Sequence, residues 1–287
     1  MMTIGFIGVG VMGEPMCRNL ITRSAETVLV FDRVPEPVDR LVTVGAEAAA
    51  SIAEVGERCE VVLLSLPGGP ELEAVAADLV AAMGGGSVVV DLTTAPVDLT
   101  RRLAGQARER GVGWVDAPVA RTREAAQAGT LAVMVGGDEA VIERVRPLLA
   151  TFGTDISPCG PVGCGQIAKI LNNYVLFQNV VALGEAITIA RRSGMDPARL
   201  IEVIGTGSGD SFALRNHATR AMLPGDFPLK AFSADYARKD LSYGLQLAAE
   251  AGVEVPGAEL ADRLLKAASD AGHGDEYWPT LLRIIDS

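Results

Sequence analysis

The stretch Thr3–Ile7 (TIGFI) runs directly into Gly8–Gly13 (GVGVMG). The apolar run predicts a buried strand, and the helical periodicity of Met12–Arg23 predicts a helix after the glycines. Asp32 stands 19 residues beyond the last of these glycines, at the end of the next predicted strand. A G-x-G-x-x-G pattern alone is a weak signal. A strand before it, a helix after it and a later acidic residue together favour a dinucleotide-binding unit over a tight turn that binds nothing.

Each glycine of this pattern has a physical reason. Gly8 permits the tight turn, Gly10 lets the backbone approach a pyrophosphate, and Gly13 lets helix and strand pack closely. The pyrophosphate then lies at the positive helix N-terminus. Val11 and Met12, between these glycines, are therefore also expected to contact the cofactor.

Asp32 bears on the choice of cofactor. Its carboxylate would accept hydrogen bonds from ribose hydroxyls and repel a 2′-phosphate, which favours NAD(H) over NADP(H). Arg33 leaves NADP(H) open, because an arginine there could bind that phosphate.

The chain divides in composition near residue 162. Residues 1–162 contain 25 valines and residues 163–287 contain 6, and β-branched residues favour strands. The first part alternates apolar runs with helix-like segments, which predicts an α/β domain with a parallel sheet covered on both faces. The second part, residues 163–287, is predicted to be all-helical. The predicted strands are Thr3–Ile7, Val28–Phe31, Val61–Ser65, Ser87–Asp91, Gly113–Ala117 and Leu131–Val135.

Charge and composition exclude several classes of protein. Among the 287 residues, Lys+Arg is 25 and Asp+Glu is 36, a net charge of 25 − 36 = −11. This balance argues against nucleic-acid and membrane-surface binding. Four cysteines without a CxxC pair and two histidines predict no metal site. The N-terminus does not resemble a signal peptide and no apolar stretch predicts a membrane span, so we expect a cytoplasmic protein.

The second part opens with a long predicted helix, Gln166–Arg192, which Gly194 stops. Because it is apolar on most faces, we expect it to be buried against the first domain or a second subunit. Lys169 and Asn173 interrupt it at positions i and i+4, so they share a face. A lysine there could protonate a carbonyl oxygen while an amide orients it; the alternative is a lysine that reaches solvent.

Asp116–Val119 (DAPV) ends a predicted strand, where open α/β sheets bind ligands. Arg121 follows, and it could bind an anionic substrate bidentately. The alternative is a solvated loop arginine. Arg123 is the weaker candidate, and for it we favour a solvated position on a helix surface.

Five motifs in this order resemble the β-hydroxyacid dehydrogenase family, and the resemblance covers essentially the whole chain. It implies a Rossmann domain, a long interdomain helix, an all-α second domain and a homodimer or homotetramer. The five motifs are GFIGVGVMG (5–13), DAPV (116–119), GTL (129–131), KILNN (169–173) and KD (239–240).

The resemblance also implies roles for individual residues. Lys169 would be the catalytic acid/base and Asn173 its supporting group, while Thr94 would lie near the nicotinamide. Further expected cofactor and substrate contacts are Leu66, Pro67, Phe232, Lys239 and Asp240.

One segment departs from the family pattern. The family usually continues DAPV with Ser-Gly-Gly, whereas this chain has Ala120, Arg121 and Thr122. This variant, with Asn172 beside Asn173, is similar to 3-sulfolactaldehyde reductases. We therefore expect the substrate to be a short anionic β-hydroxy acid that carries a carboxylate, a sulfonate or a phosphonate.

Two alternatives remain. Imine reductases use the same architecture, although they usually replace the lysine with Asp or Tyr. A dinucleotide-binding module without catalysis is the other; such degenerate relatives lose the lysine.

Overall fold

The computed structural model describes residues 2–229 and 231–287, and the chain forms two compact units. The first ends at Lys169 and the second begins at Ile170, inside the long helix α8 (Cys164–Arg192). The sequence suggested a boundary at residue 162. The difference arises because the first turn of α8 belongs to the first unit.

The first unit contains a nine-stranded sheet in the order β3-β2-β1-β4-β5-β6-β8-β7, with β9 also paired to β8. The predicted α/β class is confirmed, and β1 to β6 are parallel. One edge differs from a purely parallel sheet, because β8 runs antiparallel to β6 and β7. An apolar run predicts a strand but not its direction. The strands are β1 (Thr3–Ile7), β2 (Thr27–Phe31), β3 (Glu47–Ala48), β4 (Val61–Leu64), β5 (Val88–Asp91), β6 (Gly113–Asp116), β7 (Val119–Ala120), β8 (Leu131–Gly136) and β9 (Gly153–Gly160).

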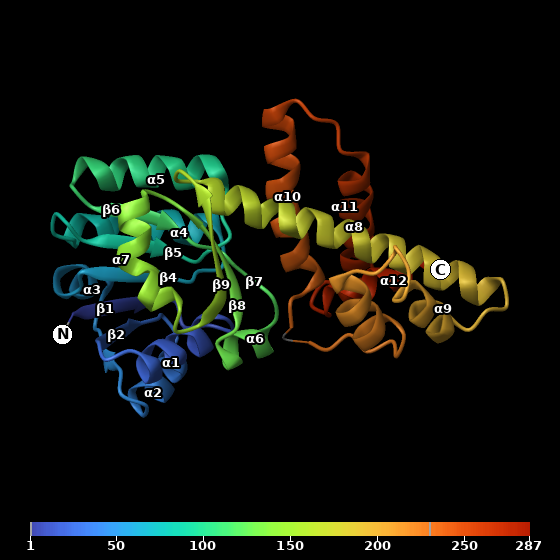
Figure 1. The fold of residues 1–287 in the computed structure, drawn as a ribbon, viewed down its shortest axis with the longest axis horizontal. Helices are drawn as coiled ribbons and strands as arrows, with labels where there is room; N and C mark the ends of the chain where they lie inside the picture. Colours follow the sequence, from blue (N-terminus) through green and yellow to red (C-terminus); the bar gives the residue numbers. More distant parts are fainter. Residues whose placement is uncertain (1, 230) are drawn as a thin grey trace. The chain divides into compact units, whose positions relative to one another are not determined.

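Helices cover both faces of this sheet (Figure 1). Successive residues of a strand point to opposite faces, so Phe6 packs with one set of helices and Ile7 with the other. The first set is α1 (Gly13–Arg23), α2 (Pro35–Val42), α6 (Arg123–Ala128) and α7 (Glu139–Leu149), and the second is α3 (Ile52–Arg58), α4 (Gly69–Ala82) and α5 (Val97–Glu109).

The sequence did not predict β3, β7, β9, α3 or α6, all of which are short or lie at an edge. Strand β9 pairs only with β8 and most of its residues are not buried, so it has no continuous apolar run. Pro158 within it is typical of an edge strand. Helix α3 spans only seven residues, too few for a periodic signal, and begins where Ser51 accepts a hydrogen bond from the Glu54 backbone N–H.

The second unit is helical and has its own core. Phe177 on α8 and Trp278 pack edge to face, with ring centroids 4.9 Å apart, and both are buried. His217 is also buried, with Nδ1 2.6 Å from the Tyr277 hydroxyl, and burial lowers the pKa of His217 to about 4. After α8, this unit contains α9 (Pro197–Ile204), η1 (Leu214–Met222, a π-helix), α10 (Ala234–Ala251), α11 (Pro256–Ala268), η2 (Ser269–His273), η3 (Trp278–Leu281) and α12 (Leu282–Ile285).

The predicted helix over 229–251 begins too early. Ser233 caps α10 by accepting a hydrogen bond from the Tyr236 backbone N–H, and Leu229 pairs with Glu276 in a short bridge. Lys230, which the prediction included, lies outside the described residues.

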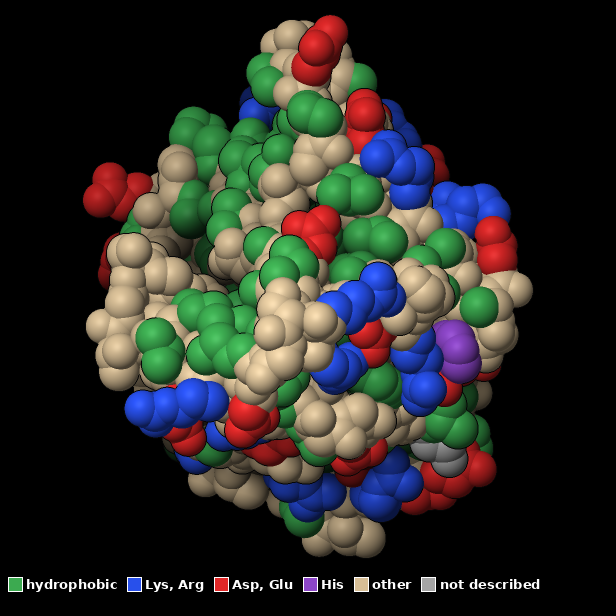
Figure 2. Space-filling model, turned by 90° about the vertical axis from the view of Figure 1, so that its right-hand side faces the viewer, with side chains coloured by type: hydrophobic (Ala, Val, Ile, Leu, Met, Phe, Trp, Pro, Cys, Tyr) green, Lys and Arg blue, Asp and Glu red, His purple; other side chains and the backbone are tan. Residues whose placement is uncertain are grey.

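Helix α8 is less buried within one chain than its sequence suggested. Leu171, Val175 and Ile189 are all exposed. Figure 2 shows one side of the molecule, on which hydrophobic side chains gather beside charged ones. A second subunit covering α8 stays a prediction. Across the described residues, no helix combines the length and apolar character that crossing a membrane requires.

Candidate functional site

The loop Gly8–Gly13 joins β1 to α1 and requires two of its three glycines for its own geometry. Gly8 has a φ of +90°, and a Cβ there would lie 2.3 Å from the Ser65 carbonyl oxygen. A Cβ at Gly13 would lie 2.0 Å from the Gly8 carbonyl oxygen. A Cβ at Gly10, in contrast, would meet no described atom within 4 Å. Packing within the protein therefore does not demand Gly10, whereas close approach of a ligand to the backbone would.

Asp32 lies at the end of β2 with both carboxylate oxygens bound to backbone N–H groups. Oδ2 accepts from Val9 at 2.7 Å and Oδ1 accepts from Val34 at 2.9 Å. The carboxylate thus joins the glycine loop to the segment before α2 and fixes a negative charge there. The neighbouring Arg33 is exposed.

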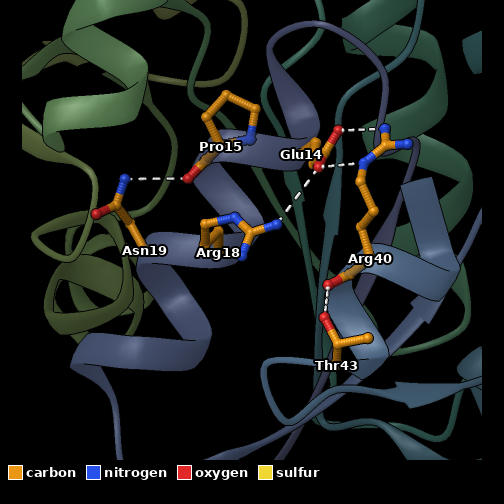
Figure 3. Close-up of polar contacts among 6 residues, drawn as sticks. All are labelled: Glu14, Pro15, Arg18, Asn19, Arg40 and Thr43. Carbon is orange, nitrogen blue, oxygen red and sulfur yellow. Dashed lines mark hydrogen bonds and ion pairs between the residues drawn. The ribbon is translucent and has the colours of Figure 1, made fainter.

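The start of α1 is bonded to two other helices, and Figure 3 shows the contact with Arg40 of α2. Glu14 binds Arg40 of α2 through two hydrogen bonds of 2.9 and 2.7 Å, and Arg18 lies 3.5 Å away. The hydrogen bond from Arg40 is the main cause that lowers the pKa of Glu14. Asn19, one turn further along α1, donates to the Ala126 carbonyl oxygen of α6 at 2.8 Å. These bonds fix the helix whose N-terminus follows the glycine loop.

The predicted cofactor residues Leu66, Pro67 and Thr94 lie on two neighbouring loops. They follow β4 and β5, which pair in parallel, so both loops leave the same edge of the sheet. The Leu66 backbone N–H donates to the Thr93 hydroxyl at 3.1 Å, which joins the loops directly.

Two buried carboxyl groups end the adjacent strands β5 and β6. Asp116 accepts hydrogen bonds from the backbone N–H groups of Gly163 at 2.8 Å and Gln166 at 2.9 Å, and thereby binds the first turn of α8. Asp91 accepts from the Thr93 backbone N–H at 3.0 Å. Burial raises the pKa of Asp116, and it raises the pKa of Asp91 to about 7. From the sequence we expected Asp116 at a ligand crevice, but not that it binds the first turn of α8. A charged residue at the end of an apolar strand was the only sequence feature that pointed to it.

Lys169 follows this anchored turn. It lies three residues beyond Gln166, is half-buried, and ends the first unit. Asn173 is four residues further along the same continuous helix, as expected from the spacing.

The predicted substrate segment forms a tight loop between β7 and α6. Ala120 is buried in β7, and the Thr122 hydroxyl caps α6 by accepting from the Ala125 backbone N–H. Arg121 has a φ of +91°, the only positive value among described non-glycine residues. A glycine adopts this conformation without strain, and glycine is the residue that the family pattern has here.

The Arg121 guanidinium binds groups of its own unit. It donates to the Thr130 carbonyl oxygen at 2.6 Å and lies 2.7 Å from an Asp155 carboxylate oxygen. The Thr154 hydroxyl is the largest cause that lowers the pKa of Asp155, followed by Arg121. Sequence reasoning missed Asp155, because β9 was not predicted.

Four predicted site residues of the second unit are linked in a series of polar contacts, which we call the buried polar chain. Asn173 donates to Asp240 Oδ2 at 3.0 Å and accepts from Asn172 at 3.3 Å. Lys239 Nζ lies 2.9 Å from Asp240 Oδ1 and 4.0 Å from the centre of the Tyr236 ring. Asn173 and Asp240 are both buried.

Phe232, the remaining predicted residue of this unit, lies among aromatic side chains. It stacks on Phe177 with ring centroids 6.4 Å apart and meets the Tyr236 ring at 5.5 Å.

Family models match nearly all of the chain. Residues 3–162 match the NAD binding domain of 6-phosphogluconate dehydrogenase, and residues 163–285 match the model described as NAD-binding of NADP-dependent 3-hydroxyisobutyrate dehydrogenase.

Individual relatives match over nearly their full length. A 2-(hydroxymethyl)glutarate dehydrogenase of Eubacterium barkeri is 34% identical, with 98% of this chain and 94% of the relative covered. An NAD-dependent L-serine dehydrogenase of Pseudomonas aeruginosa is 32% identical, with 100% and 98% covered. The structure of Mycobacterium tuberculosis 3-hydroxyisobutyrate dehydrogenase with L-serine superposes with a TM-score of 0.92 at 31% identity, over 100% of both chains.

These matches confirm the predicted family, fold class and nicotinamide dinucleotide cofactor. The likeness to sulfolactaldehyde reductases and the roles of single residues stay predictions. The chain belongs to the β-hydroxyacid dehydrogenase family of oxidoreductases that act on hydroxyl groups.

Proposed function

We propose that this chain interconverts a short anionic β-hydroxy acid and its aldehyde or ketone, with Lys169 as the general acid/base. The proposal rests on two features that lie at one edge of the sheet. The open glycine position, Gly10, follows β1, and the ends of β5 and β6 anchor the turn of α8 that precedes Lys169. A dinucleotide-binding loop and a half-buried lysine thus belong to the same carboxyl edge, where α/β sheets bind ligands.

The residues fit NAD(H). A dinucleotide, when bound, supplies or accepts the hydride. Gly10 leaves room for a pyrophosphate, and the fixed carboxylate of Asp32 favours ribose hydroxyls over a 2′-phosphate. The P. aeruginosa relative is named as NAD-dependent, which supports the same preference. Arg33 is the residue that would bind a 2′-phosphate if the preference were reversed.

Lys169 exchanges the proton of the substrate oxygen. In the reductive direction its ammonium donates to the carbonyl oxygen, and in the oxidative direction its amine accepts the hydroxyl proton. Asn173 orients Lys169, and the bond to Asp240 fixes the Asn173 amide in turn.

Arg121 neutralises the anionic group of the substrate, with Ala120 and Thr122 beside it in the same loop. Asn172 is a further proposed substrate contact. The Arg121 guanidinium is partly exposed and pairs with an exposed carboxylate, Asp155. Ion pairs of this kind contribute little to stability, so a substrate anion can replace Asp155. A sulfonate or a phosphonate offers three oxygens to this arginine, so either group could bind it with two parallel hydrogen bonds.

The test is NADH consumption with sulfolactaldehyde, succinic semialdehyde, methylmalonate semialdehyde and a cyclic imine. Lys169→Ala is expected to lower kcat by roughly 10²- to 10⁴-fold and to leave NADH binding intact. Lys266→Ala, which removes a surface ion pair with Asp270, is the matched control. Undiminished turnover of Lys169→Ala would contradict the assignment, and imine reduction alone would favour the imine reductase alternative.

A further inference from the structure

We infer that Gln166 is a positioning residue that sets Lys169 relative to the loop after β5. This inference rests on the proposed role of Lys169. The amide of Gln166 binds both sides of that loop: Oε1 accepts from the Ala95 backbone N–H at 3.1 Å, and Nε2 donates to the Thr93 carbonyl oxygen at 2.6 Å. The residue between them is Thr94, which is expected near the nicotinamide.

Gln166 is completely buried, and its backbone is held as well. Its N–H donates to Asp116 at 2.9 Å, so one residue connects the ends of β5 and β6. Both loop groups are satisfied by a side chain that accepts at one atom and donates at another, as an amide does, because one loop group is a donor and the other an acceptor. A side chain of equal size without these atoms would leave a buried N–H and a buried carbonyl unpaired.

The glycines around this turn allow the close seating of α8. A Cβ at Gly165 would lie 2.5 Å from the Met134 carbonyl oxygen, and a Cβ at Gly136 would lie 2.7 Å from Asp116 Oδ1. Larger residues would push the helix away from the strand ends. The glycines therefore set how closely the first turn of α8 approaches the strand ends, and Gln166 sets its rotation about the helix axis.

Lys169 lies three residues after Gln166 on the same helix, so its position depends on the position of this turn. A helix that rotates or slides slightly moves a side chain one turn later by a similar amount. Displacements near 1 Å can lower a rate by about 100-fold when the reacting groups must be aligned. Gln166 acts on the reaction through this alignment and not through contact with substrate.

The test compares Gln166→Met with Gln166→Glu. For the methionine variant we expect kcat to fall roughly 10- to 100-fold, with the Kd for NADH within about twofold of wild type and a larger primary isotope effect with deuterated NADH. Gln106→Met, an exposed position on α5, is the matched control and should change none of these quantities.

The glutamate variant supplies a readout that a purely structural role would not move. A protonated glutamate has the donor and acceptor pattern of glutamine, whereas the ionised form repels the Thr93 carbonyl oxygen. The ratio of its kcat to that of wild type should therefore rise as the pH falls, while the ratio for Gln166→Met stays constant. The neighbouring carboxyls of Asp91 and Asp116 cancel in the ratio for Gln166→Met, which adds no charge. In Gln166→Glu they raise the pKa of the new carboxyl by like-charge repulsion, which moves the rise of its ratio to higher pH.

Two results would overturn the inference: a kcat of Gln166→Met within twofold of wild type, or a glutamate ratio that does not change with pH. If the methionine variant does not fold, the pH dependence of the glutamate ratio still tests the inference. If Lys169→Ala is inactive and either result is found, only the role of Gln166 fails. If Lys169→Ala is fully active, the proposed role of Lys169 is wrong, and the role of Gln166 that rests on it falls with it.

Discussion

Asp32 and Asp116 of the first unit and Asp240 of the second are held in different ways. In the first unit Asp32 and Asp116 accept hydrogen bonds from backbone N–H groups. In the second unit Asn173, Asp240 and Lys239 bind one another through side chains. Backbone donors are placed by the fold of whole loops, whereas side-chain partners depend on single rotamers. We therefore expect changes in the first unit to act through loop and helix position, and changes in the second to act through the loss of individual bonds.

The largest effect is expected where a side chain would displace the backbone. Gly165→Ala puts a Cβ 2.5 Å from the Met134 carbonyl oxygen, and such overpacking lowers the free energy of unfolding by about 3 kcal/mol. Denaturant unfolding measures this. Gly105→Ala is the control, since a Cβ there meets no described atom within 4 Å, and it should stabilise α5 by about 0.5–1 kcal/mol. Equal stability of the two variants would show that α8 is not seated tightly.

In the second unit the central bond acceptor is Asp240. Asp240→Ala leaves the Asn173 amide and the Lys239 ammonium without this acceptor, which should lower the free energy of unfolding by about 2 kcal/mol. Asp270→Ala, which breaks an exposed ion pair with Lys266, should cost less than about 0.5 kcal/mol. If both substitutions cost the same, the buried polar chain contributes no more than a surface pair.

A pH effect is expected from Asp91 in the first unit. Burial raises the pKa of Asp91 from 3.8 to about 7, so the folded state binds its proton more tightly than the unfolded state. Its stabilising contribution is complete below pH 3.8 and is lost as the pH rises through 7. Between pH 6 and 8 this loss amounts to about 1.4 kcal/mol.

Asp91→Asn keeps the acceptor for the Thr93 N–H and cannot ionise. Thermal unfolding from pH 5 to 8 should therefore show a smaller decline for this variant than for wild type. Parallel curves for the two proteins would mean that Asp91 does not titrate in this range.

The smallest effect concerns the loop of Arg121. Both Arg121→Gly and Arg121→Ala lose the pair with Asp155, but only glycine relaxes a φ of +91°. The glycine variant should be more stable than the alanine variant by about 1 kcal/mol, as measured by thermal unfolding. The opposite order would show that this backbone position carries no strain.

The sequence alone determined the α/β class and the glycine loop, because local spacing encodes both. Gly8, Gly10 and Gly13 each have a reason that follows from a strand, a turn and a helix in succession, and the structure agrees with the reasons for Gly8 and Gly13. The edge strand β9 escaped prediction, because an edge strand needs no continuous apolar run.

Tertiary structure decided which distant residues meet. Asp116 and Gln166 are 50 positions apart, and Arg121 and Asp155 are 34 apart. No local pattern joins such pairs, since their contact depends on the order of the strands and on where α8 begins. Sequence thus identified the lysine on its helix, and only the folded sheet placed the aspartate and the glutamine that hold this helix in position.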